Sequence, residues 1–235
     1  MTQRSILAGQ SPTVIVRAHS NVSVEGWDSD RISADSYSRW GLQIERRSEP
    51  EFARIRAKVG EHVLLDVRVD PIGRLQKNAG EKAIEISLGA SGKVQVPFDS
   101  RVKIYAGKSV DVHDLRGEVT VSAGHDVRIR NVGTLVHLSA GRAVDFECET
   151  VKGTNVKFEA GRDLRCYIRG LTSARFMVDD LGGYWEGVIG EGRTRIQLKC
   201  GGDATLVTDQ TVIGQPPYDL LGKIERPDAA KSTNS

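Results

Sequence analysis

The stretch that decides the fold is VKIYAGKSVDV, residues 102–112, because close variants of it follow three more times. They are VTVSAGHDVRI at 119–129, VHLSAGRAVDF at 136–146 and VKFEAGRDLRC at 156–166. The glycines at their centres lie 17, 17 and 20 residues apart. A period this short excludes the helical repeats, which need about 33 residues or more. It is typical of one turn of a β-solenoid.

Four columns of apolar residues flank these glycines, five and three residues before each one and three and five residues after it. The members are Val102, Val119, Val136, Val156, Ile104, Val121, Leu138, Phe158, Val110, Val127, Val144, Leu164, Val112, Ile129, Phe146 and Cys166. A spacing of two within each pair is the periodicity of a strand with one buried face. β-Branched residues dominate, as a pleated buried surface prefers. Glycine between the pairs supplies a corner that a side chain would block.

A further copy of the pattern stands at Cys200-Gly201, 40 residues after Gly161, which we interpret as two steps of 20. The segment between them fits the first two columns with Phe176 and Val178. There Asp180-Leu181 replaces Ala-Gly, which predicts a turn with a displaced corner.

The predicted fold is therefore all-β, a right-handed single-stranded parallel β-solenoid in one continuous domain. Right-handedness follows from the general rule for parallel crossovers. Residues 1–99 keep the alternation but lose the period, so we expect irregular early strands or a cap there. Residues 100–210 hold the regular turns, and residues 211–235 are expected to form a C-terminal lid and a mobile polar tail.

Composition bounds the function classes. Of 235 residues, 39% are hydrophobic and 27% charged, which is typical of a folded soluble chain. A net charge of +2 provides no global field for nucleic acid or anionic lipid, so neither is an expected partner. No apolar run approaches the roughly 18 residues that span a bilayer, and the N-terminus lacks a secretory signal. Three cysteines make no full disulfide set. We therefore expect a cytoplasmic location.

Three motifs carry a family resemblance: NVSVEGWD at 21–28, VQVP at 94–97 and GEVTV at 117–121. With them, residues 12–210 resemble the bacterial putative-adhesin β-helix family, a domain of unknown function. The resemblance implies a β-helical fold and a surface or adhesive role, and it brings no catalytic motif. A weaker resemblance is to the bactofilins, cytosolic β-helices that polymerise end to end, and it implies a self-assembling scaffold.

Two features are candidate contact surfaces. A cationic residue follows each glycine of the repeats, and the stripe consists of Lys108, His125, Arg142 and Arg162. If the corners stack, the stripe would meet an anionic polymer, and the alternative interpretation is a solvated corner. The second feature is Tyr184-Trp185, which follows two glycines and is the best candidate for an exposed aromatic contact patch.

A second outward column, four residues after each glycine, alternates in sign through Asp111, Arg128, Asp145 and Arg165. We expect a ladder of ion pairs between stacked turns. Each exposed pair contributes about 0 to 1 kcal/mol, so the ladder's main effect would be on register.

Nothing in the sequence predicts an active site. The acids Asp28, Asp30, Asp179 and Asp180 are the candidates, but neighbouring strand residues point to opposite faces. No zinc spacing, phosphate-binding loop or nucleophile motif is present, so no metal, cofactor or small-molecule substrate is expected.

We expect a non-enzymatic structural or interaction module that presents rigid β faces to an unknown macromolecule or to itself. The alternatives are a bactofilin-like scaffold and a carbohydrate-active β-helix enzyme.

Overall fold

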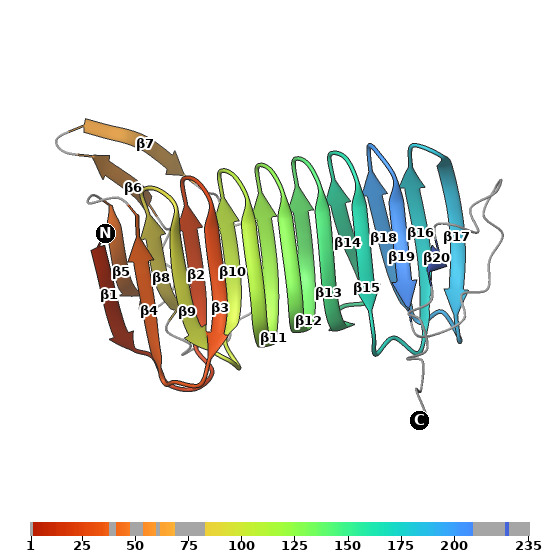
Figure 1. The fold of residues 1–235 in the computed structure, drawn as a ribbon, viewed down its shortest axis with the longest axis horizontal. Coiled ribbons are helices and arrows are strands. Elements are labelled where there is room, and N and C mark those ends of the chain that lie inside the picture. Colours follow the sequence, from red (N-terminus) through yellow and green to blue (C-terminus); the bar gives the residue numbers. More distant parts are fainter. Residues whose placement is uncertain are drawn as a thin grey trace, which may run out of the picture. The chain divides into compact units, whose positions relative to one another are not determined.

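The computed structural model describes residues 2–37, 41–47, 54–59, 62–68, 83–208 and 224–225. These residues form strands and turns and contain no helix, which confirms the all-β prediction (Figure 1). Within the described chain there is accordingly no helix long and apolar enough to span a membrane. The predicted lid and tail lie outside the described residues except for Ile224–Glu225. The chain divides into two compact units, Met1–Val119 and Thr120–Ser235.

The first unit is built from three levels, and in each level two successive strands are joined by a corner. The levels are β2–β3, β8–β9, and β10 with the start of β11. The strands of this unit are β1 (Thr2–Leu7), β2 (Thr13–Ala18), β3 (Val22–Trp27), β4 (Arg31–Ser36), β5 (Leu42–Arg47), β6 (Arg54–Val59), β7 (His62–Arg68), β8 (Ala83–Leu88), β9 (Gly92–Pro97), β10 (Arg101–Ala106) and β11 (Val110–Ala123). β2 pairs in parallel with both β8 and β10, and β3 pairs in parallel with both β9 and β11. The earliest pair in the sequence therefore lies between the two later pairs.

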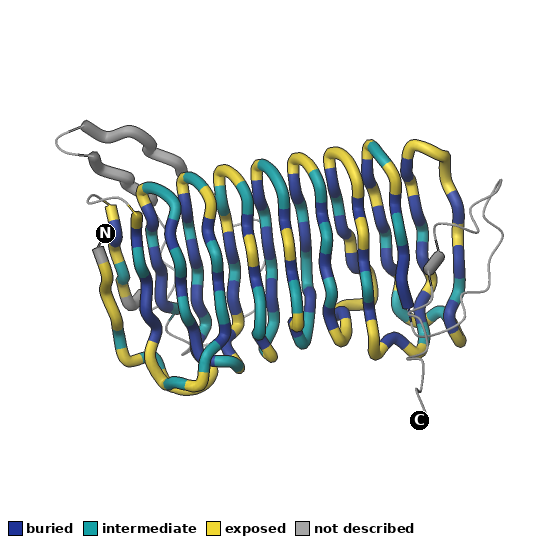
Figure 2. Tube along the Cα trace, in the orientation of Figure 1, coloured by how far each residue is buried: buried dark blue, intermediate teal, exposed yellow. Residues whose placement is uncertain are grey.

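The β2–β3 pair carries the same apolar columns as the later repeats. Val14 stands opposite Val102 and Val22 stands opposite Val110, in both cases 88 residues away in sequence. The inward residues of these strands are buried, and Figure 2 shows this alternation along the tube. The period fades before residue 100 because stacked neighbours are far apart in the sequence. The strands themselves remain in the stack.

Antiparallel strands end this stack on one side. β4 runs antiparallel to β9, and β1 runs antiparallel to β4. In the other layer β5 runs antiparallel to β8. β6 and β7 form a separate antiparallel pair.

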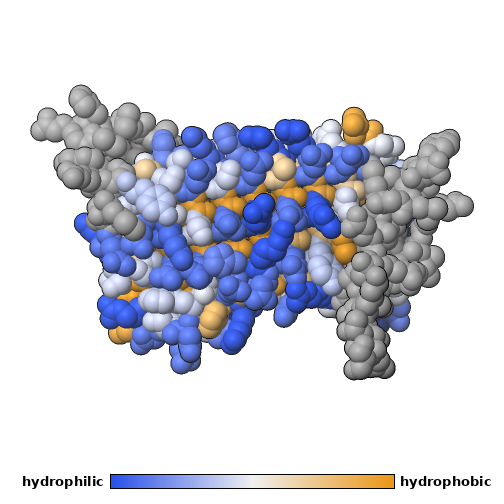
Figure 3. All heavy atoms as spheres, viewed as in Figure 1, coloured by the Kyte–Doolittle hydropathy of each residue, from blue (hydrophilic) through white to orange (hydrophobic). Residues whose placement is uncertain are grey.

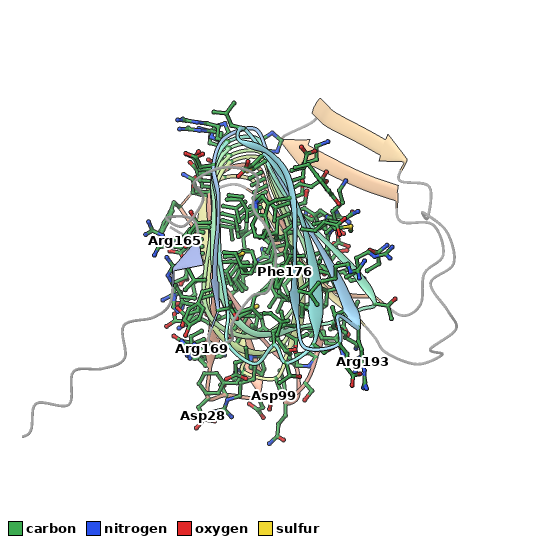
Figure 4. The ribbon with its side chains drawn as sticks, turned by 90° about the vertical axis from the view of Figure 1, so that its right-hand side faces the viewer. Asp28, Asp99, Arg165, Arg169, Phe176 and Arg193 are labelled. Carbon is green, nitrogen blue, oxygen red and sulfur yellow. The ribbon has the colours of Figure 1, made fainter. Side chains whose placement is uncertain are left out.

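The second unit has two layers of strands. Its strands are β12 (Val127–Ala140), β13 (Val144–Val151), β14 (Asn155–Ala160), β15 (Leu164–Ile168), β16 (Ala174–Asp180), β17 (Gly183–Ile189), β18 (Thr194–Cys200), β19 (Ala204–Thr208) and β20 (Ile224–Glu225). Layer A contains the end of β12, then β14, β18, β16 and β17. Layer B contains the start of β12, then β13, β15, β19 and β20. Figure 4 shows Phe176 between the two layers.

The 40-residue step from Gly161 to Gly201 corresponds to one level of the stack, so the expectation of two levels is wrong. β18 pairs directly with β14, and β19 pairs directly with β15 (Figure 1). β16 pairs with the far side of β18, where Phe176 stands opposite Ile196 and Val178 opposite Leu198. The columns assigned to Phe176 and Val178 are thus correct, but β18 lies between their strand and β14.

Fifteen of the sixteen predicted column residues are buried, the exception being the half-buried Val136. The register of β12 against β13 shifts between Ile129 and Val132, and Leu135 is buried in place of its neighbour Val136. The sequence pattern missed a further buried column in this unit, which consists of Val132, Cys148 and Ile168.

Glycine at the corners is required by close backbone approach. A Cβ atom on Gly161 would lie under 3.0 Å from the carbonyl oxygen of Gly141, and one on Gly141 would lie equally close to that of Gly124. On Gly201 it would lie 2.6 Å from the carbonyl oxygen of Gly161. Real Cβ atoms essentially never approach so closely, so the prediction of blocked corners is confirmed at these positions.

Candidate contact surface

Hydrophilic side chains cover most of the described surface in the view of Figure 3, with narrow lines of hydrophobic atoms between them. In the second unit the stripe residues His125, Arg142 and Arg162 are stacked neighbours. The Arg142 amide donates to the His125 carbonyl at 3.1 Å, and the Arg162 amide donates to the Arg142 carbonyl at 2.9 Å. Arg142 and Arg162 are exposed, whereas His125 is half-buried. Lys108 is exposed at a corner of the first unit, where its amide donates to Ser20.

An acidic column runs beside the stripe. Asp126 accepts a hydrogen bond from the Ala143 amide at 3.2 Å, and Asp163 accepts one from the Asp203 amide at the same distance. Arg142 lies 3.7 Å from the Asp126 carboxylate. These carboxylates fix the corner and offset much of the positive charge of the stripe. The corner is therefore a poorer anion-binding surface than its cations alone indicate.

The predicted aromatic patch is half wrong, because Tyr184 is 54% exposed but Trp185 is only 3% exposed. The two residues are neighbours on β17, so their side chains point to opposite faces of the layer. The Tyr184 hydroxyl donates to the Glu186 carboxylate, and this hydrogen bond raises the pKa of Tyr184. Trp185 packs inward, and its Nε1 has no hydrogen-bond partner among the described residues.

Asp180 has a structural role that the sequence pattern did not reveal. The first amides of β12, β13 and β15 each donate to a carbonyl of the next level, as Leu164 does to Asp203 at 2.9 Å. For the first amide of β19, at Ala204, the acceptor is a carboxylate oxygen of Asp180 at 3.2 Å. The other oxygen of Asp180 accepts from Gly182 at 2.8 Å. Asp180 therefore supplies the last acceptor in this series of backbone hydrogen bonds along the corner.

The other candidate acids lie apart from Asp180. As predicted, Asp179 points to the opposite face, where it is exposed 3.6 Å from the ammonium group of Lys199. Asp28 and Asp30 are exposed in the first unit. Across the described ranges, no three His, Cys, Asp or Glu side chains are grouped so that they could hold a metal ion.

Three members of the predicted ladder, Arg128, Asp145 and Arg165, stand in register, whereas Asp111 is opposite Ser23. Asp145 stands opposite both Arg128 and Arg165. Its carboxylate bonds the guanidinium of Arg130, with Nη1 at 3.1 Å from Oδ1. Arg169 pairs with Glu147 in the same layer. Figure 4 shows Arg165 and Arg169 on the outer side of this layer, away from Phe176.

A pair of arginines in layer A was not among the predicted contact residues. Arg175 on β16 stands directly opposite Arg195 on β18, and both side chains are exposed. Both positive charges act on the Tyr184 phenol and partly oppose the rise in its pKa. Each arginine immediately precedes an inward apolar residue, Phe176 or Ile196. This position, six residues before Leu181 or Gly201, is the sequence signal that the two arginines share.

A polar row in the first unit is internally satisfied. Glu25 accepts from the Lys93 ammonium group and from Gln95. The Lys93 bond is the largest cause of the lowered pKa of Glu25. Next to it in register, His113 lies 3.0 Å from the Asp114 carboxylate. These groups support the register of the strands.

All three cysteines are buried and free. Cys166 lies in the core and Cys200 at a corner, as predicted. Burial raises the pKa of Cys148 to about 12 and raises that of Cys166 well above its ordinary value. These thiols therefore lack the thiolate character of a reactive cysteine.

No family model matches the sequence. No curated protein matches it either. Among solved structures, the chain is similar to one described as a putative cell adhesion protein from Clostridium sporogenes. The similarity covers 88% of this chain and 98% of that chain, with 10% sequence identity and a TM-score of 0.37. Similarity at this level carries no argument about function.

Proposed function

We propose that the chain is a non-enzymatic interaction module whose right-handed, single-stranded β-solenoid presents rigid side faces to a macromolecular partner. Parallel in-register pairing recurs within each unit and supports the solenoid. Outward side chains of such a stack form straight columns at the spacing of parallel strands, about 4.8 Å. A flat array of this kind suits binding of an extended partner. The adhesive role implied by the family resemblance is one form of this function.

The observation that carries the proposal is the way the strand stacks end. In layer A of the second unit β17 turns back antiparallel to β16, and Asp180 accepts the amide hydrogen bond of Ala204 at the corner. In layer B, Ile224–Glu225 of β20 still pair in parallel with β19. In the first unit β1, β4 and β5 are antiparallel to the strands they cover. End-to-end polymerisation needs an open edge that continues the parallel ladder. The antiparallel strands that end the first unit and layer A of the second unit therefore favour binding through side faces over a bactofilin-like scaffold.

Two observations support a non-enzymatic role. Asp180 is 7% exposed, and both of its oxygens accept backbone hydrogen bonds. Asp179 points away from it toward Lys199. Carbohydrate-cleaving sites need two carboxylates that face one substrate. Asp179 and Asp180 do not provide that geometry. Separately, the cytoplasmic location stays a prediction from the sequence.

The test is light scattering on size-separated protein at about 1 to 100 µM, a range in which exposed strand edges associate. Negative-stain microscopy of the same fractions identifies any fibres. We expect one molar mass, that of a monomer or a small oligomer, at every concentration. Growth into thin fibres with rising concentration would contradict the proposal and favour the scaffold.

A further inference from the structure

Arg175 and Arg195 form an unusual pair of like charges. Adjacent strands are about 4.8 Å apart, and like charges directly opposite one another destabilise a sheet. Here the two arginines stand in register on neighbouring strands, with Asn155 next in the same row. In layer A of the described chain, no carboxylate lies within ion-pair distance of either guanidinium.

The nearby acids are engaged elsewhere. Glu186 accepts the hydroxyl hydrogen bond of Tyr184, and Asp179 lies beside Lys199. The arrangement therefore leaves two guanidinium groups with free donors on one face of layer A. The exposed Tyr184 is on the same layer, opposite Asp179, four residues along β16 from Arg175. Such a pair is stabilised when an anion bridges it, because each guanidinium donates charge-assisted hydrogen bonds to oxygen.

We propose that Asn155, Arg195, Arg175 and Tyr184 form a binding site for an acidic glycan on layer A. The arginines bind a carboxylate or sulfate group of the polymer, the Asn155 amide bonds a sugar hydroxyl, and the Tyr184 ring packs on a sugar face. This inference rests on the proposed function, since it names the partner class for one side face.

A glycan fits this site better than a nucleic acid does. Binding to nucleic acid draws its affinity from several neutralised phosphates and from bases stacked on successive aromatic rings. The site offers two unpaired cations and one exposed aromatic ring, Tyr184. The net charge of +2 adds no long-range attraction for a polyanion. A glycan with spaced acidic groups needs neither a dense cationic surface nor a row of aromatic residues.

The experiment is isothermal titration calorimetry with polygalacturonate and dextran sulfate, with neutral dextran and single-stranded DNA as comparison ligands. The test variant is Arg175→Gln with Arg195→Gln. The matched control is Arg142→Gln with Arg162→Gln, which removes two exposed arginines from the corner stripe. We expect the wild type to bind at least one acidic glycan and the test variant to bind it roughly tenfold or more weakly. The control should stay within about twofold, because its arginines lie beside acids.

Four outcomes would overturn the inference: no binding of either acidic glycan, equal binding of neutral dextran, equal or tighter binding of DNA, or loss only in the corner control. Unchanged melting temperatures of both variants show that the fold is intact. Light scattering tests the proposed function independently. A protein that stays monomeric in light scattering but does not bind acidic glycans would therefore refute this site without contradicting the proposed interaction module.

Discussion

Both units stack parallel strands with aligned apolar columns, but the order of the strands along the chain differs between them. In the first unit the earliest strand pair, β2–β3, is inserted between two pairs that come 70 or more residues later. In the second unit the late strand β18 is inserted between β14 and the earlier β16. In both units the inserted strand keeps the apolar columns of its neighbours. The order of levels in the stack is thus independent of the order of strands in the chain.

The units differ in how they fill the interior and form their corners. The second unit buries Phe146, Phe158 and Phe176, whereas the core residues of the first unit's described part are aliphatic or small. A Cβ would meet a backbone carbonyl at Gly141, Gly161 and Gly201 in the second unit, and at Gly107 in the first. At the corresponding corner of β2–β3 the residue is His19, and its side chain is exposed. The second unit therefore depends more on a few large side chains, and the β2–β3 corner of the first unit forms without a glycine.

Phe158→Ala should have the largest effect. Phe158 is fully buried, and its ring meets that of Phe146 edge-on with centroids 4.8 Å apart. Removing it leaves a cavity, and we expect a loss of about 3–5 kcal/mol in the free energy of unfolding, measured with urea. Phe158→Leu is the control and should cost less. A loss under about 1 kcal/mol for the alanine variant would show that the aromatic core is not what distinguishes the second unit.

Gly161→Ala tests the corners and should cost about 2–4 kcal/mol, because the new methyl group meets the Gly141 carbonyl. The comparison variant is His19→Ala in the first unit, which should change stability by no more than about 0.5 kcal/mol. Urea unfolding of both variants measures the contrast. Equal losses would mean that the two corners are equivalent after all.

Asp180→Ala removes the last acceptor in the series of backbone hydrogen bonds along the corner. The amide groups of Ala204 and Gly182 lose their partner, and a loss of about 1–3 kcal/mol is expected in urea unfolding. Asp179→Ala, one residue earlier and exposed, should change stability by about 0–1 kcal/mol. If both substitutions cost the same, the cap would have no special role at the end of the second unit.

All three cysteines lie in the second unit, so alkaline pH should affect that unit first. The pKa of Cys148 is about 12 in the folded chain against an ordinary 9.0, because burial penalises the thiolate. The unfolded chain then loses its proton first, so this contribution to stability is complete below pH 9.0 and is lost as pH rises toward about 12. Thermal melts across this range should show the decline, and Cys148→Ala should reduce its slope. A thiol reagent that labels the native protein rapidly at neutral pH would contradict the burial.

The smallest effect on stability is expected from the ion pair between Arg130 and Asp145 in layer B. Arg130→Gln breaks the pair with Asp145 and should cost about 0–1 kcal/mol, with a small fall in melting temperature. Arg128→Gln is the matched control two residues earlier on the same strand. A larger fall for Arg128→Gln would restore the ladder that the sequence indicates.

The fold was predictable where stacked neighbours are also successive repeats. Val102 and Val119 share a column visible in the sequence, but Val14 and Val102 share one across 88 residues. The internal spacing of Val14, Val16, Val22 and Val24 equals that of the later repeats and was the available signal. An insertion separates neighbours in space from neighbours in sequence, and period alone cannot recover them.

The candidate site was less predictable than the fold. The corner stripe of the second unit followed from position after the glycine, and the structure brings its members together. Trp185 was predicted to be exposed but is buried. The glycines that flank β17 do not show which of its alternate residues point inward. Arg130 reaches Asp145 diagonally, which depends on side-chain conformation. The Arg175–Arg195 pair depends on β18 lying beside β16, a pairing that the sequence order conceals.

The insertion of β2–β3 also bears on how the protein is made. Val14 leaves the ribosome 88 residues before its partner Val102, and at about 5–20 residues per second this delay is roughly 4 to 18 s. For most of that interval both edges of β2 and β3 lack their parallel neighbours, because β8 and β9 follow them by 70 residues. Such long-range closure is slow and leaves a nascent chain open to wrong pairings. Transposing the segment 13–27 within the chain to a position next to residue 100 should therefore speed refolding and leave the native pairings unchanged.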